Sequence, residues 1–146
     1  MGAWGSGIFQ NDDASDWAAE FDEADPSERA DLVTEALDTA VEDAAEGGLD
    51  ADVAGQALAA AALVARLSPG GGAVDLEGGP SATDVPGLEV DDTVRATAAK
   101  AARAAIDESS EWYELWSEAG SLDEAMSPVT EILRVLEPTG PVNLSV

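Results

Sequence analysis

The stretch from Ala51 to Leu67 reads ADVAGQALAAAALVARL, and it decides the fold of this chain. Alanine has the highest intrinsic helix propensity, and Asp50 can cap the first turn. A helix over this stretch has little polar surface, because most of its sides carry the apolar residues Ala54, Leu58, Ala61, Ala62, Val64 and Ala65. Because a helix that is apolar on nearly every side is normally buried, we expect a helix over 51–67 that forms the middle of a bundle.

Two amphipathic helices are expected before this stretch. The first runs from Asp12 or Asp13 to about Ala24, capped by Asn11 or an adjacent Asp, since Ala14, Trp17, Ala18 and Phe21 follow helical spacing. The second begins at Asp25-Pro26-Ser27-Glu28, which supplies an N-cap acid, a proline at the first helical position and a glutamate at the third. Its stripe is Val33, Leu37, Ala40, Val41 and Ala44, and Gly47-Gly48 ends it.

Three further helices are expected after residue 90. One starts at Asp91 or Asp92 and reaches about Glu108, and a short one capped by Ser109 or Ser110 runs to Gly120. The last opens on the capping box Ser121-Leu122-Asp123-Glu124. Pro128 lies inside it and predicts a kink, or a restart capped by Ser127.

These elements predict a small all-α protein, a single-domain bundle of five or six helices over residues 1–137. Residues 68–90 contain Pro-Gly-Gly-Gly, Gly-Gly-Pro and Val-Pro-Gly, which predict a flexible loop. Residues 138–146 are expected to form an extended tail. A short strand pairing of 3–9 with 142–146 is an alternative for the two ends of the chain.

The charge of the chain is strongly one-sided. Its 146 residues include 31 acids and six bases, for a net charge of −25. Such a surface repels phosphate groups, so nucleic acid and anionic membranes are excluded as partners. Two interpretations remain, namely adaptation to a salt-exposed or high-GC organism, and an acidic face that mimics DNA or neutralises a basic partner.

The chain contains no cysteine and no histidine. Their absence excludes thiol nucleophiles, histidine general bases, Ser-His-Asp catalysis, haem ligation and ordinary zinc sites. No apolar run reaches the roughly 20 residues that cross a bilayer, and no secretory signal is recognisable, which predicts a cytoplasmic protein. The oligomeric state is left open.

The beginning of the chain carries an unusual motif, formed by Gly2, Trp4, Gly5, Gly7, Phe9, Asn11, Asp12, Ala14, Asp16 and Trp17. It resembles the N-terminal signature of a family of small bacterial proteins known as domain of unknown function 4259. A second similarity is the segment Ser110-Glu111-Trp112-Tyr113-Glu114-Leu115-Trp116. The resemblance implies no activity, ligand or catalytic residue.

Two candidate sites follow from these residues. Asp12, Asp13 and Asp16 place carboxylates within one turn of a helix and could hold Mg²⁺, Mn²⁺ or Ca²⁺, although acids at a helix start also serve as caps and complement its dipole. The aromatic and polar residues of the two motifs could bind a partner, although tryptophans four residues apart are typical of a core. These residues are Trp4, Phe9, Asn11, Asp12, Trp112 and Trp116.

The exclusions favour a non-enzymatic interaction protein of the immunity or regulatory type, with a protein partner of basic character. No cofactor is expected in that case. The alternative is a hydrolase that depends on a divalent metal held by the N-terminal aspartates.

Overall fold

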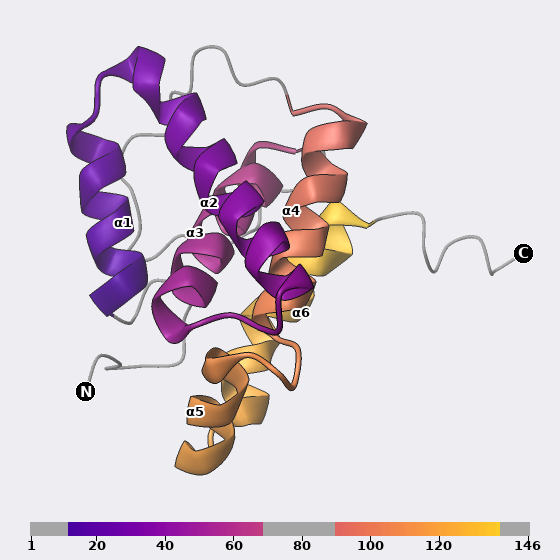
Figure 1. The fold of residues 1–146 in the computed structure, drawn as a ribbon. Coiled ribbons are helices and arrows are strands. Elements are labelled where there is room, and N and C mark those ends of the chain that lie inside the picture. Colours follow the sequence, from indigo (N-terminus) through magenta and orange to yellow (C-terminus); the bar gives the residue numbers. More distant parts are fainter. Residues whose placement is uncertain (1–11, 69–89, 138–146) are drawn as a thin grey trace, which may run out of the picture.

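The computed structural model describes residues 12–68 and 90–137, and these residues form an all-α bundle (Figure 1). The α-helices are α1 (Asp12–Glu23), α2 (Arg29–Ala45), α3 (Ala51–Leu67), α4 (Asp92–Ala105), α5 (Glu111–Ala119) and α6 (Leu122–Leu136), and η1 (Pro26–Glu28) is a 3₁₀ turn. The expected fold class is therefore confirmed. The strand pairing, the interior of the 68–90 loop and the 138–146 tail concern residues outside the described ranges.

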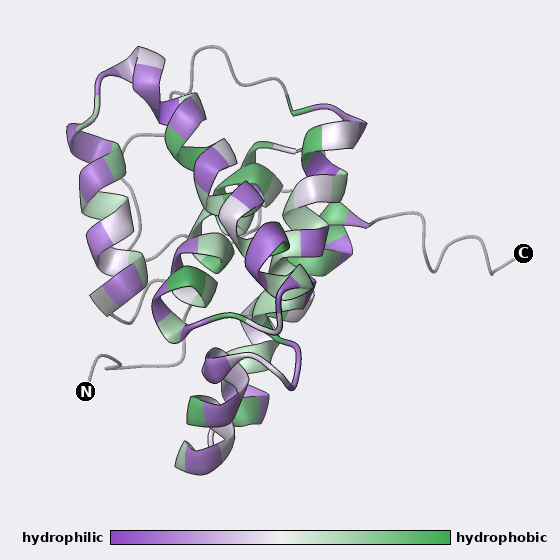
Figure 2. Ribbon diagram, in the orientation of Figure 1, coloured by the Kyte–Doolittle hydropathy of each residue, from purple (hydrophilic) through white to green (hydrophobic). Residues whose placement is uncertain are grey.

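Helix α3 occupies the centre of the bundle and packs against α1, α2 and α4, while α2 also packs against α4 (Figure 1). Helix α3 also packs against α5 and α6. Every residue from Ala57 to Ala65 is buried, and α3 is largely hydrophobic along its length (Figure 2). Because most of these side chains are single methyl groups, the surrounding helices approach its backbone closely. The expected central helix is confirmed.

The five predicted N-cap residues Asp25, Asp50, Asp91, Ser110 and Ser121 occupy N-cap positions, but only two of their side chains make the capping hydrogen bond. Asp91 accepts a hydrogen bond from the backbone N–H of Val94 at 2.9 Å, and Ser110 accepts one from Trp112 at 3.1 Å. The side chains of the N-cap residues Asp25, Asp50 and Ser121 accept no such bond. Helices can start without local side-chain caps where other groups satisfy their first N–H donors.

Two of the three missing capping bonds have visible causes. After Asp25 the chain forms a 3₁₀ turn, because the N–H of Glu28 donates to the carbonyl of Asp25 at 2.8 Å. At the start of α3 the N–H of Ala51 donates instead to Oε1 of Glu111, 2.8 Å away, so the cap comes from α5. Asp25 and Asp50 therefore occupy the predicted N-cap positions, but their side chains make no capping bond.

Two helix ends also differ from expectation. Helix α4 stops at Ala105 rather than near Glu108. There the carboxylate of Asp107 accepts hydrogen bonds from N and Oγ of Ser109, at 3.0 and 2.5 Å, which form a turn and lower the pKa of Asp107. Helix α6 continues through Pro128, so the alternative of a restart capped by Ser127 is wrong.

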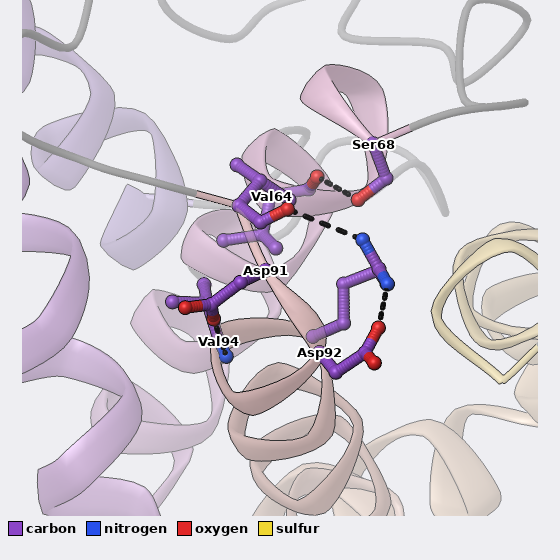
Figure 3. A network of polar contacts seen from close by, with 7 residues as sticks. Val64, Ser68, Asp91, Asp92 and Val94 are labelled. Atoms are coloured by element: carbon purple, nitrogen blue, oxygen red, sulfur yellow. Dashed lines mark hydrogen bonds and ion pairs between the residues drawn. The ribbon is translucent and has the colours of Figure 1, made fainter.

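Side chains at the end of α3 and the start of α4 form hydrogen bonds and an ion pair with nearby groups (Figure 3). The hydroxyl of the buried Ser68 donates to the carbonyl of Val64 at 2.7 Å. Arg95 donates to the carbonyl of Val90 at 3.2 Å and forms an ion pair with Asp92. These bonds order the two helix ends that precede and follow residues 69–89.

An ion pair connects the end of α4 to the end of α6. Both carboxylate oxygens of Glu137 accept hydrogen bonds from the guanidinium of Arg103. The hydrogen bond from Arg103 holds the pKa of Glu137 below its ordinary value, and the same bond raises the pKa of Arg103. A carboxyl group with a lowered pKa stabilises the fold at pH values above its unfolded pKa, and this contribution is lost as the pH falls through the folded value.

We expect Glu137→Gln to lower the free energy of unfolding at pH 7 by at most about 1 kcal/mol, since the Arg103 side chain is 59% exposed and water screens the pair. The difference from the native chain should disappear as the pH falls below 4.5, the ordinary value for this carboxyl. Urea denaturation at pH 7 and in acid measures it. Arg103→Gln, which removes the other partner of the ion pair, should lower the stability at pH 7 by a similar amount.

No helix in the described part of the chain has the length and apolar character needed to cross a membrane.

Candidate interaction surface

The angle between α1 and α2 is fixed by a buried arginine. Arg29 is 9% exposed, and its Nε and Nη2 donate to the carbonyls of Phe21 and Asp22 at 3.0 and 3.1 Å. Its guanidinium also lies 5.5 Å from the centre of the Phe21 ring. Because these carbonyls belong to the last turn of α1, where the regular helical hydrogen bonds end, Arg29 ties the end of α1 to the start of α2.

Three adjoining hollows lie against α2. A cavity of about 170 Å³ lies between α1, α2 and α3, a shallower depression of about 420 Å³ lies between α1 and α2, and another of about 430 Å³ lies on the outer face of α2. We refer to the three together as the acidic groove. It is lined by Trp17, Glu20, Glu23 and Ala24 of α1, by Glu28, Asp31, Leu32, Thr34, Glu35, Ala36, Asp38, Thr39 and Glu42, and by Val53 and Gln56 of α3.

The cavity has an apolar floor and a polar rim. Trp17 and Ala36 are buried and form its floor, and Leu32, Val53 and the polar Gln56 are half-buried beside them. The Trp17 ring is held in place by Phe21, with the ring centroids 5.3 Å apart. Glu20, Glu35 and Thr39 are exposed at the rim. The opening therefore combines apolar surface with carboxylates that stand in solvent.

The outer side of α2 carries a line of exposed acids. Asp31, Glu35, Asp38 and Glu42 recur at intervals of four, three and four residues, which places them on one helical face. At 1.5 Å per residue the line extends over roughly 16 Å. No lysine or arginine is among the described residues that line the groove. The groove is therefore a concave region of one charge sign.

The sequence-predicted site residues lie partly outside the described structure. Trp4, Phe9 and Asn11 are outside the described ranges, and so is the side chain of Asp12. Asp13 is half-buried and Asp16 is exposed near the start of α1. No set of three or more His, Cys, Asp or Glu side chains within the described residues is arranged to hold a metal ion. Because the side chain of Asp12 lies outside the described residues, the metal site of Asp12, Asp13 and Asp16 stays a prediction.

The two C-terminal tryptophans lie together on α5. Trp112 is 6% exposed and belongs to the core, and Trp116 is half-buried with its ring centroid 6.3 Å from that of Trp112. The burial of Trp112 agrees with the interpretation of this pair as core residues. A partner-binding surface shared between Trp116 and Trp4 stays a prediction.

The sequence interpretation missed the acidic groove, since none of its lining residues is among the predicted site residues. The sequence feature that could have indicated the groove is the helical spacing of Asp31, Glu35, Asp38 and Glu42. The same spacing occurs on any solvated helix face. The hollow arises only where α1 and α3 meet α2, and no local pattern encodes that meeting. Trp17, by contrast, is part of the N-terminal motif and forms a wall of the cavity.

Comparison with known proteins identifies the chain by its family alone. Neither the search of curated proteins nor the search of solved structures finds a match. The family model that does match carries the description Domain of unknown function (DUF4259) and covers residues 2–128, from the N-terminal motif to the first half of α6. This chain is therefore a member of the DUF4259 family.

Proposed function

We propose that this chain is a non-enzymatic interaction protein of the immunity or regulatory type, and that its acidic groove binds a basic segment of a partner protein. The observation that carries the proposal is the lining of the groove, where exposed carboxylates of two helices surround an apolar floor and the described lining residues include no lysine or arginine. Apolar burial supplies affinity, and the carboxylates supply selectivity for cations.

The overall charge of −25 supports the same proposal. A field of this size accelerates the encounter with a cationic partner and repels anionic ones. It also attracts any basic peptide without regard to the groove. An informative experiment must therefore separate binding in the groove from attraction to the whole surface.

We expect a fluorescent helical peptide of lysines and alanines, with lysines spaced i, i+4, i+7 and i+11, to bind the full chain at about 0.15 M salt. The triple variant Asp31→Asn, Glu35→Gln, Asp38→Asn should weaken binding about tenfold, because three exposed ion pairs of roughly 0.5 kcal/mol each are lost. Fluorescence anisotropy gives the two dissociation constants.

The matched control carries Glu114→Gln, Glu118→Gln and Glu124→Gln, which removes three exposed acids from α5 and α6. Its net charge equals that of the groove variant. If both variants weaken the peptide equally, the attraction comes from net charge alone and the proposal is wrong.

A further inference from the structure

The cavity beneath Glu20 and Glu35 has a size that selects its occupant. Its volume of about 170 Å³ lies below the roughly 300–1,000 Å³ of pockets that enclose small-molecule ligands. Trp17, Ala36, Leu32 and Val53 supply its apolar walls. A space of this size and lining suits one large apolar side chain that enters from outside.

The acids around the cavity indicate what must flank that side chain. Glu23, Glu28 and Asp31 line the depression on one side, and Asp38 and Glu42 line the one along the outer face of α2. Because the acids of α2 repeat with the period of a helix, a helix lying along α2 would present basic residues at matching intervals. An extended strand, with a side-chain period of two, would not stay in register with them.

We propose that the partner segment is a basic amphipathic helix that inserts one large apolar side chain into the cavity over Trp17 and places lysines or arginines about one turn before and after it. This inference rests on the proposed function and adds an anchor residue to it. Helices bound in grooves are commonly held by such apolar anchors. The floor then supplies affinity that does not depend on salt, and the surrounding acids set the register.

The test compares two forms of the lysine peptide, one with leucine and one with alanine at the central position. With the native chain, we expect the leucine peptide to bind at least tenfold more tightly, and this ratio should persist at 0.5 M salt. Thr39→Trp places a large side chain at the exposed rim and should reduce the ratio to near one. Ala45→Trp, at an exposed position of the same helix that lines none of the three hollows, should leave the ratio unchanged.

A second measurement requires no variant. Nuclear Overhauser effects should be observed between the leucine methyl groups of the peptide and the methyl groups of Val53. Equal affinity of the two peptides, with the acid dependence intact, would refute the anchor and leave the proposed function standing. Failure of both peptides to bind would refute the proposed function itself. A dimer of the chain that Thr39→Trp dissociates would assign the cavity to a second copy and overturn the inference.

Discussion

Replacing Gly48 with alanine is expected to lower the free energy of unfolding by roughly 2–4 kcal/mol. Gly48 has a φ of +135°, which residues with a side chain rarely adopt. A Cβ at this position would lie 2.5 Å from the carbonyl oxygen of Ser109. The two loops would then have to separate, because the contact is with backbone rather than with the end of a flexible side chain.

The loop that carries Ser109 has little freedom to move away. The N–H and hydroxyl of Ser109 are both bonded to Asp107. Two further bonds join the loops, from the N–H of Glu111 to the carbonyl of Leu49 and from the N–H of Ala51 to Glu111, each at 2.8 Å. A shift that relieves the contact at Gly48 would strain these bonds, so the loss of stability should be large.

Gly47→Ala provides the matched control. Gly47 has nearly the same φ, +133°, but a Cβ there meets nothing within 4 Å. Both variants therefore carry the backbone penalty, and the difference between their unfolding free energies in urea isolates the contact with Ser109. Equal destabilisation of the two variants would show that the close approach of the loops contributes nothing.

The Gly47-Gly48 pair illustrates what local patterns could and could not predict. The glycines mark the end of α2, as expected, since only the chain nearby is involved. The close contact between Gly48 and Ser109, some 60 residues later, depends on tertiary packing. The cap of α3 is similar, because the local candidate Asp50 stands at the N-cap but the donor at Ala51 is satisfied by Glu111 of α5.

The acidic groove also combines features that local patterns predict with features that depend on tertiary packing. The apolar and acidic faces of α1 and α2 follow from residue period, and Trp17 is marked by the N-terminal motif. The hollow between them depends on the angle at which the helices meet, which Arg29 fixes through carbonyls seven and eight residues earlier. The sequence offered no sign that this arginine turns away from solvent. Residue type alone would place Arg29 on the charged surface. Only the structure shows that Arg29 is buried beside the groove.

The second large effect is expected at α3, where we predict that Ala60→Leu lowers the free energy of unfolding by about 1–3 kcal/mol. Ala59, Ala60, Ala61 and Ala62 are each 0% exposed. Successive residues of an α-helix point about 100° apart, so these four positions sample every side of it. In an ordinary amphipathic helix, at least one of four successive positions faces solvent and accepts a larger side chain.

The same substitution at each of the four positions therefore tests the placement of α3. Urea denaturation should show destabilisation in all four leucine variants, because five helices surround α3 and the added methyl groups have no space. Ala44→Leu, at an exposed position of α2, should change stability by no more than about 0.5 kcal/mol. If one of the four α3 variants is as stable as this control, that side of α3 is open to solvent. The prediction that α3 is surrounded by other helices would then be wrong for that side.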